Sequence, residues 1–292
     1  MQNAPKLIVY GKELKLMFGY DDEFKKKAEN ELRETPEVMA ESLKTIREMV
    51  KGDKDLFVPD LDEFFIKFLR PCKWYPNSAF ALVSFFLIQR HYKFFINYPY
   101  MKENFTLMDL KNTFFSDLIV PIPVRCQDGS RLIIIHGGSK WKPREYYIYD
   151  MFKSLIFIFE QLIIEPATQI AGIQVILDMN GLPFSHVTHI TPKLATTVAD
   201  WIQRYVPYRL KNIHVINQSY IFNMIYAIFK PFLSEKLRNR IHFHGTNREK
   251  LINMVGEKAL PKEYGGSDLF ISPIEAFWQY IYYWSEEFEV RR

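Results

Sequence analysis

The spacing of apolar residues changes from strand-like to helical and back again within residues 213–245. Apolar β-forming residues open this stretch, and a segment with apolar residues at helical spacings follows them. Pro231 predicts the end of that helix, because proline cannot donate the backbone hydrogen bond that a helix interior needs. The predicted elements are, in order, a strand at 213–216, a helix at 220–229, a basic turn at 236–240 and a strand at 241–244.

The first hundred or so residues predict helices. Thr35 and Pro36 indicate a helix start, with threonine as the cap and proline in the first turn, and Gly52 indicates its end. We expect Asp60 or Asp62 to cap the following helix. The predicted helical segments are 21–34, 36–52, 61–70 and 78–97, so residues up to about 104 read as a small all-helical module.

From residue 119 the pattern alternates between strand and helix. Two apolar runs flank Asp128 and Gly129, a strong turn pair that predicts a hairpin. The run at 132–135 is apolar throughout, as expected of a strand covered on both faces. Further elements are a helix at 147–164, a strand at 173–177 and a helix from Thr191 to about Tyr205, ahead of the stretch described above. Strands and helices alternating at crossover length predict an α/β fold with a mostly parallel sheet.

Composition and charge narrow the class of protein. The chain has 292 residues, 48% hydrophobic and 16% aromatic, which suits a folded protein with large apolar surfaces to fill or to line. The formal net charge of +4 is too small to indicate nucleic-acid binding. Cys72 and Cys126 match no metal-binding spacing and predict reduced thiols. No apolar run reaches the roughly 20 residues that span a bilayer, and none resembles a signal peptide, so we expect a cytoplasmic protein with only peripheral membrane contact.

The sequence offers little catalytic chemistry. It contains no nucleophile elbow, no phosphate-binding glycine loop and no dinucleotide fingerprint. Ser185 beside His186 has no orienting carboxylate implied, so we expect neither to be catalytic. His242 and His244 share one face of a strand without a visible third ligand, and hydrogen-bonded histidines are the stronger interpretation. We therefore predict that the protein is not an enzyme and that it has neither a metal site nor a cofactor.

An apolar helix beside a basic turn is also what a protein needs to open a lipid cavity at an anionic membrane. The alternative, an ordinary buried helix in an α/β core, has the same apolar spacing and stays open on spacing alone.

Several long motifs carry a resemblance to a known family. They are FIKFLRPCKW, YDMFKSLIFIFEQLIIEPATQIAGIQVILDMNG, FSHVTHITP, IHVINQSYIFNMIYAIFKPFLSEKLRNRIHFHG and LPKEYGG. In this order, over about residues 60–266, the chain resembles the CRAL-TRIO (Sec14-like) lipid-binding family, and within it the subgroup of α-tocopherol transfer protein and cellular retinaldehyde-binding protein. The resemblance implies a helical module at 1–104, a lipid-binding α/β domain at 105–270 with a lid helix at 219–232 over an apolar cavity, and a helical tail at 271–292.

The resemblance also implies which side chains line that cavity. They are Phe152, Leu155, Phe159, Ile173, Leu177, Ile190, Val198, Trp201, Ile202, Val206, Leu210, Ile213, Ile225 and Ile228, with Val175 on the same strand face. Core packing needs the same residue types, so for any one of them it stays an alternative. Leu155 and Phe159 stand where the tocopherol binders have serines, and Trp201 where they have a smaller residue. We therefore expect a single hydrophobic ligand such as a retinoid, carotenoid, sterol, acyl or tocopherol-like lipid.

A second implied site is a basic patch that receives phosphoinositide headgroups. Its positions correspond to Arg209, Lys236 and Arg240, with Lys211 as a basic neighbour, while a further family arginine is Cys72 here. The implied mechanism begins when the patch docks on an acidic membrane. The lid face with Phe222, Ile225 and Phe229 then swings outward, and the ligand passes between cavity and bilayer.

We expect a monomer that transfers lipid between membranes. A different class of function is a sensor or adaptor, in which lipid occupancy changes a surface read by a protein partner. The residues before Asp60 and the aromatic tail after Ser272 would then be the contacts.

Overall fold

The computed structural model describes residues 7–9, 12–14, 19–54, 56, 58–87, 93–205 and 207–266. For 7–9 and 12–14, and for 85–87 and 93, it describes the backbone elements without the side chains. The predicted tail at 271–292, the predicted cavity residue Val206 and part of the predicted segment at 78–97 lie outside the described residues.

Helices dominate the N-terminal module from residue 22 onward, as the pattern predicts. They are α1 (Asp22–Leu32), α2 (Pro36–Gly52), α3 (Asp62–Leu69), α4 (Pro76–Leu87) and α5 (Lys93–Asn97). Ahead of them, β1 (Leu7–Val9) and β2 (Lys12–Leu14) form a small antiparallel sheet. The prediction of an all-helical module is wrong for these residues. Ile8 and Val9 are β-branched and favour a strand, but the runs are too short to show a period of two.

The helix caps of this module follow the predictions in one case and not in another. Thr35 caps α2 through a 3.3 Å hydrogen bond that its hydroxyl accepts from the Val38 amide, with Pro36 as the first helical residue. At α3 the cap residue is Leu61, which makes no side-chain cap, so the predicted capping role of Asp60 or Asp62 is wrong. Both carboxylates instead accept hydrogen bonds from the guanidinium of Arg47.

A five-stranded sheet forms the centre of the second part of the chain. Its strands are β3 (Ile119–Ile122), β4 (Arg131–His136), β5 (Ile173–Asp178), β6 (Leu210–Ile216) and β7 (Ile241–Gly245), in the spatial order β3-β4-β5-β6-β7. β3 pairs antiparallel with β4, which confirms the hairpin, and all later pairs are parallel. Such a sheet needs helical crossovers between consecutive strands, and the chain supplies them.

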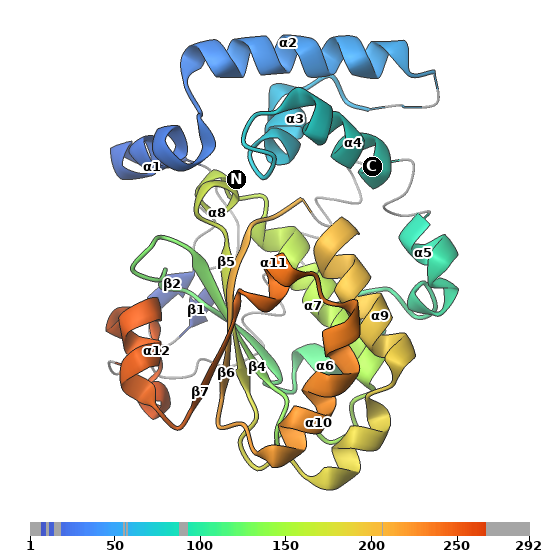
Figure 1. Cartoon of the computed structure of the whole chain (residues 1–292), viewed down its shortest axis with the longest axis vertical. Coiled ribbons are helices and arrows are strands. Elements are labelled where there is room, and N and C mark those ends of the chain that lie inside the picture. Colours follow the sequence, from blue (N-terminus) through green and yellow to red (C-terminus); the bar gives the residue numbers. More distant parts are fainter. Residues whose placement is uncertain are drawn as a thin grey trace.

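Helices cover both faces of this sheet (Figure 1). α7 (Ile148–Leu162), α9 (Pro192–Asp200) and α10 (Tyr220–Phe229) lie on one face, and α12 (Arg248–Val255) lies on the opposite side. α9 continues as one turn of π-helix, Trp201–Tyr205. Shorter helices are α6 (Lys111–Phe114), α8 (Pro166–Ala171) and α11 (Glu235–Arg238), with 3₁₀ turns at Pro99–Met101, Phe184–His189, Lys230–Phe232, Glu257–Ala259 and Lys262–Tyr264.

Two hydrophobic cores form, and one short helix connects them. The larger core surrounds the sheet, and the smaller one joins the helices of the N-terminal module. Ile170 of α8 is fully buried in the smaller core, although α8 belongs to the second part of the chain. Beside it, Arg70 donates to the Glu34 carboxylate at 2.7 Å and to the Gln169 side chain at 2.7 Å. The N-terminal module is therefore attached to the sheet domain by the buried packing of Ile170 and by the hydrogen bond from Arg70 to Gln169.

Candidate functional site

The predicted cavity residues meet on one face of the sheet, beneath the helices α7, α9 and α10. Every one of them except Val206, which lies outside the described residues, belongs to or packs against the larger core. Strand register explains the arrangement: Val175 lies opposite Ile213, and Leu177 opposite Val215, so their side chains share one face of the sheet. Phe243 continues that face on β7 and contacts Phe222 of α10, with ring centroids 6.1 Å apart.

The degree of burial differs among these side chains. Phe152, Phe159, Ile173, Val175, Ile190, Trp201, Leu210 and Ile225 are buried. Leu155, Leu177, Val198, Ile202, Ile213 and Ile228 keep accessible surface. Leu177 and Ile213 are notable because they belong to β5 and β6, which have paired strands on both sides. On the opposite face of the same strands, Ile176 and His214 are fully buried.

An aromatic cluster stands at the centre of these residues. The Trp201 ring meets Phe152 at 5.3 Å, Phe159 at 5.6 Å and Tyr208 at 5.7 Å between centroids. Phe159 and Tyr208 are closer still, at 4.7 Å. Trp201 opens the π-helical turn, a local irregularity that re-aims side chains and is common at functional sites. Tyr208 was not predicted from the sequence, because it precedes β6 in a segment without a readable period.

The predicted lid corresponds to α10 and the 3₁₀ turn after it. α10 ends at Phe229, just before Pro231, as proline requires. Phe222 and Ile225 are only 5% and 8% exposed, and Phe229 is half-buried, so the predicted membrane face points toward the core in this conformation. The exposed aromatic side chain of α10 is Tyr220, at 79%.

The four predicted headgroup residues lie at the amino-terminal edge of β6 and β7. Arg209 directly precedes β6, Lys211 is its second residue, Arg240 directly precedes β7, and Lys236 belongs to α11. Arg240 donates to the carbonyl of Leu210, which fixes its guanidinium against β6. Burial, followed by the charge of Arg209, lowers the pKa of Arg240 from its ordinary value. The charge of Lys236 acts on the Cys72 thiol, although burial dominates and raises the pKa of Cys72 to about 11.

One acidic residue offsets part of this basic patch. Glu31 of α1 accepts hydrogen bonds from Arg209 at 2.7 Å and from Lys211 at 3.2 Å, and it pairs with Lys27 at 2.8 Å. Burial opposes ionisation of Glu31, but the bonds from Lys27, Arg209 and Lys211 outweigh it and lower its pKa to about 2. Sequence spacing could not reveal this contact, since Glu31 is 178 residues from Arg209.

Gly172 gives Arg209 its position. It has a φ of 87°, and a Cβ there would lie 2.3 Å from the Arg209 carbonyl oxygen, so only glycine permits this close approach. The guanidinium of Arg209 also donates to the carbonyl of Ile170 at the end of α8.

The histidines form a network on the opposite face of the sheet. His214 lies 3.0 Å from His244 (Nδ1 to Nε2) and 2.7 Å from the Gln174 side-chain oxygen, while His242 contacts Asn212 at 3.1 Å. His214 is a third imidazole beside His242 and His244, and their sequence spacing did not predict it. No group of these or other described residues has an arrangement suited to holding a metal ion.

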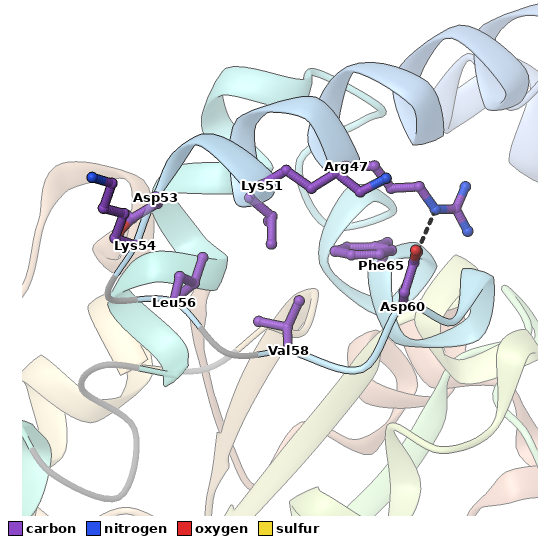
Figure 2. Close-up of a pocket in the computed structure, with 9 residues that line it drawn as sticks. Arg47, Lys51, Asp53, Lys54, Leu56, Val58, Asp60 and Phe65 are labelled. Atoms are coloured by element: carbon purple, nitrogen blue, oxygen red, sulfur yellow. Dashed lines mark hydrogen bonds and ion pairs between the residues drawn. The ribbon is translucent and has the colours of Figure 1, made fainter.

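A pocket of about 310 Å³ lies elsewhere, in the N-terminal module between the end of α2 and the segment leading into α3 (Figure 2). Val50, Leu56 and Phe65 supply apolar lining. Arg47 and Asp60, joined at 2.6 Å, supply charged lining. None of the predicted cavity residues lines this pocket.

No helix in the described part of the chain is both long and apolar enough to cross a bilayer.

Comparison of the sequence and the fold with known proteins identifies similar proteins. The model of the CRAL/TRIO domain matches residues 116–266. Alpha-tocopherol transfer protein-like of Homo sapiens is 32% identical over 243 residues, covering 82% of this chain and 69% of that protein. Clavesin-2 of Rattus norvegicus is 28% identical over 258 residues, covering 86% and 76%. The crystal structure of Sfh5 superposes with a TM-score of 0.48 at 15% identity, covering 94% of this chain and 100% of that one.

Proposed function

The chain belongs to the CRAL/TRIO domain family, and from this premise we propose that it holds one hydrophobic lipid in an internal cavity and transfers it between membranes. The proposed ligand is a retinoid, carotenoid, sterol, acyl or tocopherol-like lipid. The proposal includes a cytoplasmic monomer that contacts membranes only peripherally and catalyses no reaction. The name of the human relative, with its reference to tocopherol transfer, supports the transfer activity.

The observation that carries the proposal is the convergence of the predicted cavity residues beneath α10. They come from α7, β5, β6 and α10 and from α9 with the residues that flank it, elements that are far apart in the sequence. Leu177 and Ile213 keep accessible surface although their strands are internal to the sheet and covered by helices. Space under the helices explains that surface better than a filled core, in which interior side chains are close-packed.

A lipid in such a space is stabilised by leaving water. Each methylene group that leaves water contributes about 0.8 kcal/mol, so a long-chain lipid is held strongly only where the lining is apolar and dry. The aromatic cluster supports an apolar lining, because the Tyr208 hydroxyl is the one oxygen among the side chains of Phe152, Phe159, Trp201 and Tyr208.

Membrane docking would use the carboxyl-terminal end of the lid. Phe232, at 37% exposure, follows α10 beside Lys230, and α11 with Lys236 comes next. Each basic residue near an anionic leaflet contributes about 1 kcal/mol, an attraction that salt weakens. An exposed ring among lysines supports reversible docking through apolar and electrostatic contacts together.

The test is transfer of a fluorescent lipid from donor to acidic acceptor vesicles. Lys236→Glu combined with Arg240→Glu should slow transfer to acidic vesicles several-fold and leave binding of the lipid by the free protein nearly intact. Lys236→Glu alone separates the docking effect from the structural bond of Arg240 to β6. Lys258→Glu, the same charge change at an exposed residue beside α12, is the matched control. Unchanged transfer in the first two variants contradicts membrane docking through this patch.

A second candidate function is the lipid-occupancy sensor. The pocket of about 310 Å³ in the N-terminal module supports this sensor function. Most of its lining residues precede Asp60, in the segment predicted to contact a protein partner. A sensor binds ligand yet transfers it slowly. Fast transfer between vesicles in the absence of any other protein therefore favours the carrier over the sensor.

A further inference from the structure

Tyr208 has a buried hydroxyl group without a hydrogen-bond partner in the described part of the protein. The residue lies between the π-helical turn and β6, directly before Arg209, and its side-chain oxygen is buried although the residue as a whole is only partly buried. Buried hydroxyl groups in folded proteins nearly always have a partner, because an unpaired one loses its hydration without compensation. The Tyr208 oxygen is thus an exception that calls for a physical explanation.

The surroundings of this hydroxyl are apolar and belong to the predicted cavity. The Tyr208 ring packs on Phe159 and Trp201, at 4.7 and 5.7 Å between centroids. Burial alone raises the pKa of Tyr208 well above its ordinary value. The neighbouring Arg209 directs its guanidinium to Glu31 and to the backbone of α8. The hydroxyl therefore stays protonated at neutral pH and can donate a hydrogen bond.

Other buried polar atoms without a partner among the described residues lie in different surroundings. Ser154 and Gln161 lie on the side of α7 opposite Phe152 and Phe159, by helical spacing. The Nδ1 atom of His244 belongs to the histidine network on the other face of the sheet. Tyr208 is the residue of this group whose ring contacts predicted cavity side chains.

We propose that Tyr208 is the polar anchor of the cavity and donates a hydrogen bond to a single neutral oxygen on an otherwise apolar ligand. The inference rests on the proposed function and narrows its ligand class to neutral lipids with a carbonyl or hydroxyl group. A pure hydrocarbon would leave the hydroxyl unpaired. A carboxylate or phosphate would bring a charge into an apolar site where one neutral hydroxyl cannot compensate its lost hydration.

Pairs of ligands that differ by one oxygen test the inference. Retinol and axerophthene form one pair, and cholesterol and cholest-5-ene form another. Their dissociation constants follow from competition with a bound fluorescent lipid, with Tyr208→Phe as the variant that removes only the hydroxyl. The native protein should bind the oxygenated member of a pair about 10-fold more tightly, as expected for one buried hydrogen bond. In the variant the two members should bind almost equally.

Tyr205→Phe is the matched control, because the Tyr205 hydroxyl already accepts a hydrogen bond from Asn97 at 2.9 Å. It should leave the preference of the native protein unchanged. A preference that survives in Tyr208→Phe, or that is lost equally in Tyr205→Phe, overturns the anchor while leaving the proposed function in place.

A second measurement covers ligands outside these pairs. The native protein is incubated with a total lipid extract, and the retained lipids are identified by mass spectrometry. Neutral lipids with an oxygen atom are expected, at lower occupancy in Tyr208→Phe. Retention of hydrocarbons or charged lipids overturns the anchor alone. Retention of no lipid from the extract, together with no binding of either pair, removes the proposed function itself.

Discussion

Glu31 shows, at the scale of single residues, how a tertiary contact changes a site that the sequence describes only in part. Arg209 and Lys211 both donate to its carboxylate, so two of the four cations of the basic patch already have an anionic partner within the protein. At the proposed docking patch, a lipid phosphate would therefore compete with Glu31 for these two side chains.

Replacing Glu31 with glutamine should strengthen binding to anionic vesicles. The change removes the competing charge, and one basic residue freed near an anionic leaflet contributes about 1 kcal/mol, or roughly fivefold in affinity. Sedimentation with vesicles at two salt concentrations measures the effect, which should shrink at the higher one. Glu29→Gln, an exposed residue of the same helix, makes the same charge change as the control. Equal affinities for native protein and Glu31→Gln would show that Glu31 does not compete.

The buried histidines make stability depend on pH. Burial first, and then the neighbouring histidines, lower the pKa of His214 to about 3. Burial, with Lys250, His242 and Arg248, lowers the pKa of His244 to about 4. Unfolded histidine titrates near 6.5, so below that pH the unfolded chain binds protons that the folded protein does not. The free energy of unfolding should therefore fall as the pH drops from about 6.5 to about 4.

Denaturant unfolding at pH 7.5 and pH 4.5 measures this dependence. His244→Asn removes one of the titrating groups and should reduce the loss of stability between the two pH values. His189→Asn, at an exposed histidine, is the control. A loss of stability as large in His244→Asn as in the native protein would mean that His244 is not part of the cause.

Sequence reasoning missed these residue-level features for a common physical reason. Tyr208, Glu31 and His214 obtain their roles from partners on other elements. Glu31 is 178 positions from Arg209, and His214 is 30 positions from His244. Neither apolar periodicity nor a local motif reports such contacts. The resemblance to the CRAL-TRIO family, rather than periodicity, supplied Phe152 and Phe159 as cavity residues.

At the scale of elements, α10 is strongly apolar and buries Phe222 and Ile225. Phe222 is buried against Phe243 and Tyr226, with ring centroids 6.1 and 6.5 Å away. Ser219, the cap residue, makes no side-chain cap bond. The helix is therefore held in place by its apolar face more than by its amino-terminal cap.

Phe222→Ala should loosen α10 and speed the release of bound lipid. Truncating a buried phenylalanine costs about 3–5 kcal/mol when the site is fully packed. Stopped-flow release into excess acceptor vesicles measures the rate, and thermal unfolding measures the stability. Tyr220→Ala, at the exposed aromatic residue of the same helix, should change stability by about 0.5 kcal/mol or less. Native release kinetics in Phe222→Ala would argue against α10 as the lid.

Most of the elements could be predicted from sequence, and the exceptions have identifiable causes. The long helices and the internal strands show clear apolar periods. Some helices also have clear end signals, such as Thr35 at the start of α2 and Pro231 after α10. The helix predicted at 147–164 forms as α7, Ile148–Leu162, with both ends within two residues of the prediction. α8, α11 and β1 were missed because segments this short do not complete a readable repeat.

At the scale of the whole molecule, a buried ion pair in the N-terminal module positions the side chain, Arg70, that bonds to the sheet domain. Glu34 accepts from Arg70 through both carboxylate oxygens, at 2.7 and 2.9 Å, and from the Trp74 ring nitrogen at 3.1 Å. Arg70 also reaches Gln169, next to Ile170 of α8. We therefore expect the N-terminal module and the sheet domain to unfold together.

Glu34→Gln should destabilise the entire protein. The change leaves the Arg70 charge buried without a carboxylate, which costs about 3–5 kcal/mol in comparable pairs. Calorimetry should show one transition shifted to lower temperature. Glu48→Gln, at an exposed residue of α2, is the control and should shift it little. Two separate transitions, with only one of them shifted, would contradict the coupling of the two cores.

The position of Ile170 in the N-terminal core has a consequence for synthesis on the ribosome. Arg70 leaves the exit tunnel 99 residues before Gln169, its partner beside Ile170. At about 5–20 residues per second, the nascent helical module waits roughly 5–20 s before α8 arrives to complete it. During that interval its unfinished apolar surface is open to chaperones, so a translational pause shortly before codon 170 should increase their recruitment.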